Sequence, residues 1–165
     1  MAHADHDTAT SVIHYRMATV DDVDALANLR WHMETERHPE LPATEESYAA
    51  YLAAARENIR TEIERGAHIA FLAEAEGEAV ACAILIWWTM LPTLTDLHRK
   101  RGYVSSVYTN PAWRRRGIAR RLMEQLIAKA REMGVQRLVL WASDMGRPLY
   151  LDQGFAPSRA LEMNL

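Results

Sequence analysis

Five arginines surround a glycine where residues 110–123 are expected to start a helix. This stretch reads NPAWRRRGIARRLM and follows strand-forming residues at 103–109. A helix N-terminus carries partial positive charge and unpaired N–H groups, so it disfavours arginine and favours anions. A strand, a short loop with Pro111 and a helix entered through Gly117 would present backbone N–H groups to a phosphate. The sequence therefore predicts a bound anion, such as a pyrophosphate, with the arginines as its counter-charges.

Two other interpretations of the arginine cluster stay open at this point. It could be a solvated basic helix end without a ligand, or RRRGIARRLM could be the recognition helix of a nucleic-acid-binding module. The formal net charge of −3, the pI near 6.2 and the lack of a second basic face argue against a nucleic-acid partner. The common nucleotide-binding loops GxxxxGK(S/T) and GxGxxG do not occur, so a phosphate would be held by a different arrangement.

The whole chain has the composition of an ordinary globular protein. Its 165 residues are 49% hydrophobic and 25% charged, which favours one domain with a substantial core. We expect residues 1–10 to form a disordered tail and 11–165 a single domain. Cys82 is the one cysteine, and its apolar surroundings predict a buried hydrophobe in a cytoplasmic protein. No apolar run approaches the roughly 20 residues of a membrane span, so no membrane partner is expected.

Apolar periodicity and turn residues predict a mixed α/β sheet protein in the order β-α-α-β-β-β-α-β-α-β-β. Expected strands lie at 11–17, 69–75, 78–88, 103–109 and 137–142, with strand-like residues at 156–165 counted as two more. Expected helices begin near Asp21, after Thr44, at Arg116 and at Pro148. Thr44 should cap the second helix, and Glu76-Gly77 should form a tight hairpin turn.

The arginine-rich segment resembles the acetyl-CoA-binding segment of the GNAT superfamily of N-acetyltransferases. The family pattern is Gln/Arg-x-x-Gly-x-Gly/Ala after a strand, and here it reads Arg114-x-x-Gly117-x-Ala119. A second block, WASDMGRPLYLDQGF, is similar to a family segment with Asn, then Tyr seven residues later, then Gly-Phe. Ser143 stands in the Asn position and Tyr150 in the Tyr position. A third block, YRMATVDDVDALANL, is similar to the opening strand and helix of the family.

The resemblance implies a fold and a cofactor site. The fold would be α/β (α+β), with a mixed, mostly antiparallel sheet of about seven strands, a splay between the two central strands and about four flanking helices. Acetyl-CoA would be the acyl donor, with no metal. Its pantetheine arm would pair with the edge of the strand before the signature, and its pyrophosphate would lie on backbone N–H groups of the signature. The implied cofactor-binding residues are Val107, Tyr108, Thr109, Arg115, Arg116, Gly117, Ile118, Ala119, Arg120 and Ser143.

The resemblance also implies a mechanism, direct attack of a primary amine on the thioester in a ternary complex. Tyr150 would protonate the departing coenzyme A thiolate, and a strand N–H such as that of Val107 would stabilise the oxyanion. The general base stays open, with Glu34, Asp96, His98 and Asp144 as candidates. The acceptor, a small molecule or peptide, is not identified by the sequence, and the resemblance allows a homodimer. A non-catalytic acyl-CoA-binding or sensing domain on the same fold is the alternative.

Overall fold

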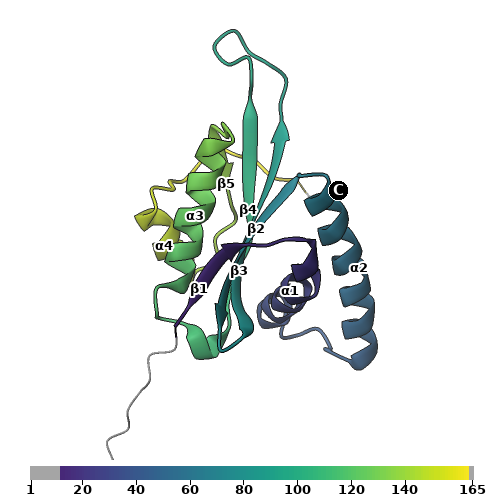
Figure 1. Ribbon diagram of the computed structural model, residues 1–165. Helices are drawn as coiled ribbons and strands as arrows, with labels where there is room; N and C mark the ends of the chain where they lie inside the picture. Colours follow the sequence, from purple (N-terminus) through teal and green to yellow (C-terminus); the bar gives the residue numbers. More distant parts are fainter. Residues whose placement is uncertain (1–11, 164–165) are drawn as a thin grey trace, which may run out of the picture.

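One sheet of five strands organises the part of the chain that the computed structural model describes, residues 12–163 (Figure 1). The expected disordered tail, residues 1–10, lies outside the described residues. The strands are β1 (His14–Met17), β2 (His68–Ala75), β3 (Glu78–Thr89), β4 (Lys100–Thr109) and β5 (Arg137–Val139). They are adjacent in chain order, and every neighbouring pair is antiparallel except β4 and β5, which are parallel. The expected mixed, mostly antiparallel sheet is therefore confirmed.

The expectation of about seven strands is wrong for the described residues. After α4 (Arg147–Asp152) the chain to residue 163 forms no strand, although two were expected there. Pro157 has no N–H to donate to a ladder, and so few residues are too short for two strands and a turn. The strand expected at 137–142 is also shorter and ends at Val139.

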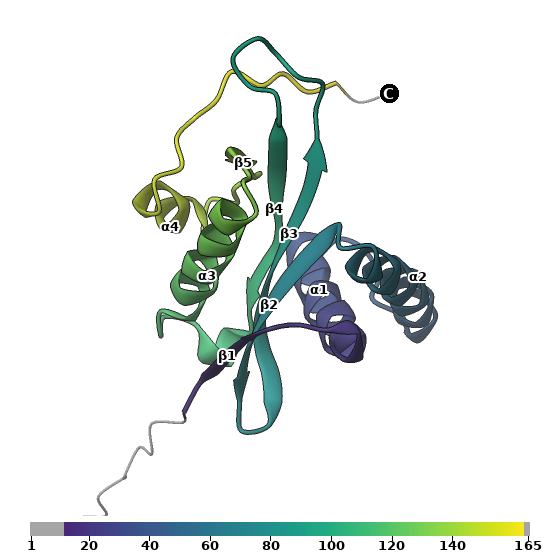
Figure 2. The same ribbon diagram turned by 45° about the horizontal axis from the view of Figure 1, so that its top comes forward.

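Helices cover both faces of the sheet, two on each. One face carries α1 (Val23–Arg37) and α2 (Glu45–Glu64), and the other carries α3 (Ile118–Glu132) and α4 (Figure 2). Short 3-10 turns at Val20–Asp22 and Pro111–Trp113 precede α1 and α3. The expected cap of α2 is confirmed, because the Thr44 side chain accepts a hydrogen bond from the Ser47 N–H. No helix among the described residues is both long enough and apolar enough to cross a bilayer.

Two hydrophobic cores lie on the two faces of the sheet. Leu122, Met123 and Leu126 of α3 are fully buried against β2, β3 and β4. Leu26 of α1 and Leu52 of α2 are buried on the opposite face. Because β3 is buried on both faces, its alternating side chains contribute to both cores. Helices α1 and α3 are thus fixed on opposite sides of β4.

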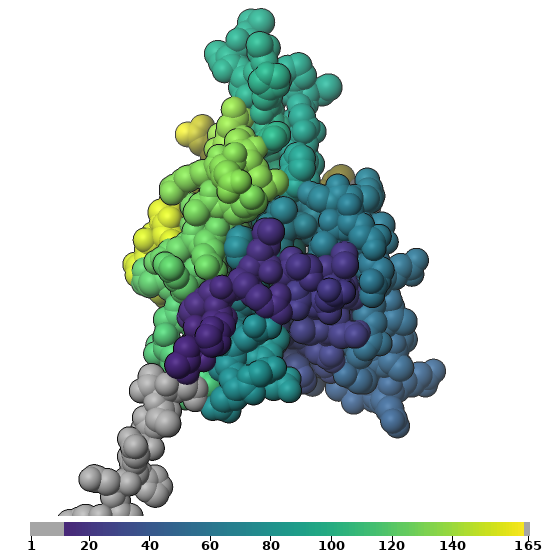
Figure 3. Space-filling view, viewed as in Figure 1, coloured from purple at the N-terminus to yellow at the C-terminus, as the bar shows by residue number. Residues whose placement is uncertain are grey.

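The hairpin between β2 and β3 follows the turn signal in the sequence. The expected turn at Glu76-Gly77 is confirmed, since both residues have positive φ, 55° and 83°, and Ala75 pairs with Glu78. The longer connection from β3 to β4 extends beyond the helices at one end of the molecule (Figures 1 and 3).

Candidate active site

A β-bulge interrupts the middle of β4. Cys82 pairs with Tyr108 and Ile84 with Ser105, so that Ser106 and Val107 together lie opposite a single residue of β3. Ser106 has a positive φ of 53°, which is a strained backbone conformation for serine. The Cys82 thiol donates to the Ser106 carbonyl oxygen at 3.2 Å. The bulge reverses the alternation of side chains along the last four residues of β4.

Strand β4 has an open edge beyond its short pairing with β5. The parallel ladder covers only Arg101–Tyr103 with Arg137–Val139, so within residues 12–163 the rest of β4 has no strand partner on that side. The N–H of Asn110 donates to Val80 of β3 at 2.9 Å. Because alternate N–H groups of a strand point to opposite sides, those of Thr109 and Val107 point away from β3, toward the open edge. The splay was expected between the two central strands, whereas this opening lies between β4 and the edge strand β5.

A row of unpaired backbone N–H groups follows the end of β4. No hydrogen bond within residues 12–163 uses the backbone N–H of any residue from Arg115 to Arg120. Arg115 and Gly117 have positive φ values of 63° and 77°, so the backbone curves around these groups. A Cβ on Gly117 would have no heavy atom within 4 Å, so there is open space beside the loop. Such an N–H concavity at the start of α3 is a site for a phosphate.

Most of the arginine side chains around this loop already have partners. Arg116 lies 4.6 Å over the Trp113 ring, Arg120 forms an ion pair with Asp152 of α4 at 2.8 Å, and Arg121 forms one with Glu124 at 3.4 Å. Arg115 is exposed and has no partner among the described residues. Arg115 is therefore the arginine of this cluster whose charge is available to a ligand.

Arg114 connects the phosphate loop to α1. Its Nε donates to the Thr109 carbonyl oxygen at 2.9 Å, and its Nη2 forms an ion pair with Glu36 at 2.5 Å. The other Glu36 oxygen accepts from the Tyr108 hydroxyl at 2.7 Å. The Tyr108 side chain thus points toward α1, so a cofactor on the opposite side of the sheet could meet only its backbone. The sequence analysis did not find this link, because Glu36 is 78 residues from Arg114.

The hydroxyl of Thr109 is an unsatisfied polar group beside the phosphate loop. Its Oγ1 atom is buried and has no hydrogen-bond partner in the part of the chain that the structure describes. A buried hydroxyl without a partner costs free energy unless a ligand supplies one. Together with the free N–H groups at 115–120, it makes the residues present a good fit for the pyrophosphate and pantetheine groups of acetyl-CoA.

Tyr150 lies on α4, half-buried. Its ring packs edge-on against Phe155, with centroids 6.0 Å apart. Burial raises the pKa of its phenol above the usual value, and the neighbouring Tyr103 of β4 adds to this effect. The phenol therefore stays protonated at neutral pH, which is the state a general acid needs. The ion pair between Arg120 and Asp152 ties this helix to the start of α3.

Ser143 lies within the loop between β5 and α4. Its Oγ accepts a hydrogen bond from the Gly146 N–H at 3.2 Å, and its carbonyl oxygen accepts from the Arg147 N–H at 2.9 Å. The residue is exposed and its hydroxyl proton stays available for a ligand.

Glu34 is the candidate base that lies near the bulge. It is partly buried on α1, 3.4 Å from Arg30 and 3.7 Å from Arg37. Arg30 itself donates to the Ser106 hydroxyl at 2.5 Å. Burial raises the pKa of Tyr103 of β4, and the charges of Arg30, Arg37 and Glu34 on α1 act on it to a smaller extent.

The other candidate bases are placed differently. Asp96 lies in the β3–β4 connection, where it accepts from Gln136 at 2.9 Å and pairs with Arg101 at 3.5 Å. Burial alone would raise its pKa, but these partners hold the pKa below the usual value. His98 and Asp144 are exposed. Within residues 12–163, no group of three or more His, Cys, Asp or Glu side chains is arranged to hold a metal ion.

A sheet that opens beside a helix N-terminus with free N–H groups is an arrangement suited to the acyl-CoA cosubstrate of an acetyltransferase. The chain belongs to the acetyltransferase (GNAT) family, whose model matches residues 23–155. It is therefore an N-acetyltransferase. The expected membership of this superfamily is confirmed, and acetyl-CoA is the acyl donor of the family.

Solved structures agree with this assignment. The chain is similar to a predicted acetyltransferase with acetyl-CoA from Clostridium acetobutylicum, at 25% identity and TM-score 0.80 over 93% of this chain and 96% of that one. It is also similar to a GCN5-related N-acetyltransferase from Ralstonia eutropha JMP134, at 26% identity and TM-score 0.78 over 93% and 99%. A ribosomal-protein-alanine N-acetyltransferase from Brucella melitensis biovar Abortus 2308, at 23% identity and TM-score 0.65 over 93% and 98%, shares the fold. No curated protein matches the chain.

Proposed function

We propose that the protein transfers the acetyl group of acetyl-CoA to the primary amine of a small molecule or peptide, by direct attack in a ternary complex. The observation that carries the proposal is the row of free backbone N–H groups from Arg115 to Arg120 at the start of α3. A doubly charged pyrophosphate there gains several hydrogen bonds and the partial positive charge of the helix end. Arg115 is the side chain best placed to add a counter-charge.

The open edge of β4 holds and polarises the acyl group in this proposal. The N–H groups of Thr109 and Val107 would hydrogen-bond the pantetheine arm and the carbonyl oxygen, and the bulge at Ser106 aims the Val107 N–H. Removing one such oxyanion donor costs about 2.7–4 kcal/mol of transition-state stabilisation in other enzymes. The bound thioester supplies an activated acetyl group.

Tyr150 supplies the proton in the proposed reaction. Its raised pKa keeps the phenol protonated until the thiolate departs. The amine must reach the site unprotonated, and Glu34 is our candidate for taking its proton through water, because its ion-pair partner Arg30 reaches the bulge of β4 at Ser106. Proximity in the ternary complex supplies much of the remaining rate enhancement.

The test is a calorimetric titration with acetyl-CoA, desulfo-coenzyme A and ATP. We expect micromolar binding of the two coenzyme A compounds, because their pantetheine arm would pair with the edge of β4. ATP has no pantetheine arm, so we expect it not to bind. An amine panel with detection of released thiol then tests transfer. A folded protein that binds no coenzyme A compound would refute the proposal. Binding without thiol release from any amine would favour a non-catalytic acyl-CoA sensor.

A further inference from the structure

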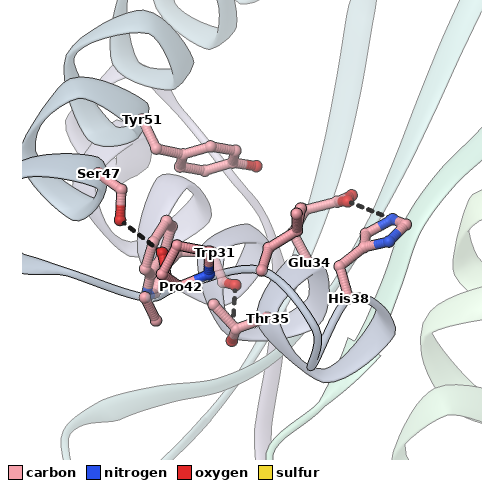
Figure 4. A pocket seen from close by; sticks show the side chains of 9 residues that line it. Trp31, Glu34, Thr35, His38, Pro42, Ser47 and Tyr51 are labelled. Carbon is pink, nitrogen blue, oxygen red and sulfur yellow. Dashed lines mark hydrogen bonds and ion pairs between the residues drawn. The ribbon is translucent and has the colours of Figure 1, made fainter.

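A second concave site lies between α1 and α2, away from the phosphate loop (Figure 4). It is an open cavity of about 290 Å³ between the C-terminal half of α1, the connecting loop and the first turns of α2. This volume is at the lower end of ordinary small-molecule sites and is enough for one ring-sized group. None of the cofactor-binding residues inferred from the sequence lines it.

The walls of this cavity are apolar and held in place. The Trp31 ring packs against Tyr48 and Tyr51, with centroids 5.2 and 5.3 Å apart. Leu41 and Pro42 of the connecting loop form another wall, and Leu41 is 62% exposed. The loop is fixed because the Ser47 hydroxyl donates to the Pro42 carbonyl oxygen at 3.2 Å. Exposed apolar side chains on a rigid aromatic wall favour an apolar ligand.

One end of the cavity is polar but carries no unbalanced negative charge. Glu34 lies there, surrounded by Arg30, Arg37 and His38 at 3.4, 3.7 and 3.9 Å. A polycation would find its carboxylate already paired.

This polar end lies close to the bulge of β4. Arg30, which donates to Ser106 at 2.5 Å, is one helical turn before Glu34. Four residues of helix advance about 6 Å, so Glu34 lies about one turn of α1 beyond Arg30, whose side chain spans the remaining distance to the bulge. An amine at this end would be near the reacting groups while its body lies against Trp31 and Tyr51.

We infer that this cavity binds the acceptor, and that the acceptor is a primary amine on an apolar body about as large as one aromatic side chain. The inference rests on the proposed acetyl transfer and adds the class of acceptor. Polyamines and amino sugars would bury charges or hydroxyls against apolar walls without partners. They are therefore poorer acceptors than arylalkyl amines.

The test uses phenethylamine as the probe and two matched alanine substitutions. Ala43 lines the cavity, whereas Ala50 is exposed on α2 and does not. We expect A43F to fill the cavity and weaken phenethylamine binding, measured by calorimetry, by about tenfold or more. A50F should leave binding within about twofold. In the thiol-release assay, kcat/KM for phenethylamine should exceed that for spermidine and glucosamine 6-phosphate by at least about tenfold.

Several results would overturn the inference, each separable from the proposed function. Phenethylamine that does not bind, or that binds equally well to A43F, removes the cavity as its site. If A43F does not fold, L41D serves as a second variant. It places a carboxylate on the apolar wall and should weaken phenethylamine binding by a similar factor. If the protein acetylates only polar amines, the proposed acetyl transfer is supported and the proposed acceptor class is wrong. If A43F weakens phenethylamine binding but the protein does not bind acetyl-CoA, the cavity is a ligand site and the proposed function is wrong.

Discussion

Replacing Glu36 with glutamine tests whether α1 and the phosphate loop are held together by one carboxylate. Glu36 accepts hydrogen bonds from the Tyr108 hydroxyl at 2.7 Å and from Arg114 at 2.5 Å. A hydrogen bond to a charged group contributes about 1.5–3 kcal/mol, but the Glu36 and Arg114 side chains are 38% and 28% exposed, which reduces this contribution. We therefore expect E36Q to lower the free energy of unfolding by about 2 kcal/mol.

The assay is thermal unfolding, combined with titration of acetyl-CoA. For a protein of this size, about 1 kcal/mol corresponds to about 2–4 °C, so Tm should fall by about 4–8 °C. Arg114 also bonds to the Thr109 carbonyl oxygen at the entrance of the phosphate loop, so acetyl-CoA affinity should fall by about threefold to tenfold. The control is E57Q, which neutralises an exposed glutamate of α2 that has no ion pair among residues 12–163.

The pH dependence of this effect has a defined sign. Burial alone would raise the pKa of Glu36, but the hydrogen bonds from Tyr108 and Arg114 outweigh it and lower the pKa. A lowered pKa gives stability that is fully present above the unfolded value, about 4.3, and is lost as pH falls through the folded value. The difference in Tm between wild type and E36Q should persist from pH 7 to about 5 and shrink below about pH 4. An E36Q protein as stable as E57Q at pH 7 would refute the reasoning.

Three further predictions concern other parts of the site. Y150F should lower kcat by about 100-fold with little change in acetyl-CoA affinity, and unchanged turnover would remove Tyr150 from the mechanism. G117E and G134E place the same side chain at φ values of 77° and 74°, with open space around each. Both variants should therefore have a similarly reduced free energy of unfolding. In calorimetry, only G117E should fail to bind acetyl-CoA. Cys82 is fully buried and its thiol pKa is raised to about 12, so native protein at pH 8 should resist iodoacetamide while unfolded protein reacts; equal labelling of both would contradict this burial.

Local signals in the sequence predicted the elements that depend on local chemistry. The Glu76-Gly77 hairpin and the Thr44 cap follow from turn and capping preferences within a few residues. The third helix was expected from Arg116 but begins at Ile118, because Gly117 has a positive φ of 77° and cannot be part of the helix. The expected burial of Cys82 is likewise confirmed, because a small apolar residue in an apolar run of β3 has little alternative.

Features that depend on distant partners could not be predicted in this way. The bulge at Ser106 has no local signal, since serine is not favoured at positive φ, and it depends on the register of β3 and on Arg30 from α1. The role of Arg114 was equally hidden, because its partner Glu36 is far away in the chain. The number of strands was overestimated because β-propensity at 156–165 does not reveal whether a ladder partner is in reach.

The arginines at the start of α3 would be unfavourable if they all faced the helix dipole, and the structure removes most of this difficulty without a ligand. Glu36, Asp152 and Glu124 neutralise Arg114, Arg120 and Arg121, and the Trp113 ring covers Arg116. These pairings neutralise the side-chain charges, but the backbone N–H groups from 115 to 120 still have no hydrogen-bond partner within residues 12–163. An anion would therefore be held mainly by the backbone and by Arg115. It follows that R115A should weaken acetyl-CoA binding more than R121A, although both remove one positive charge from the same helix end.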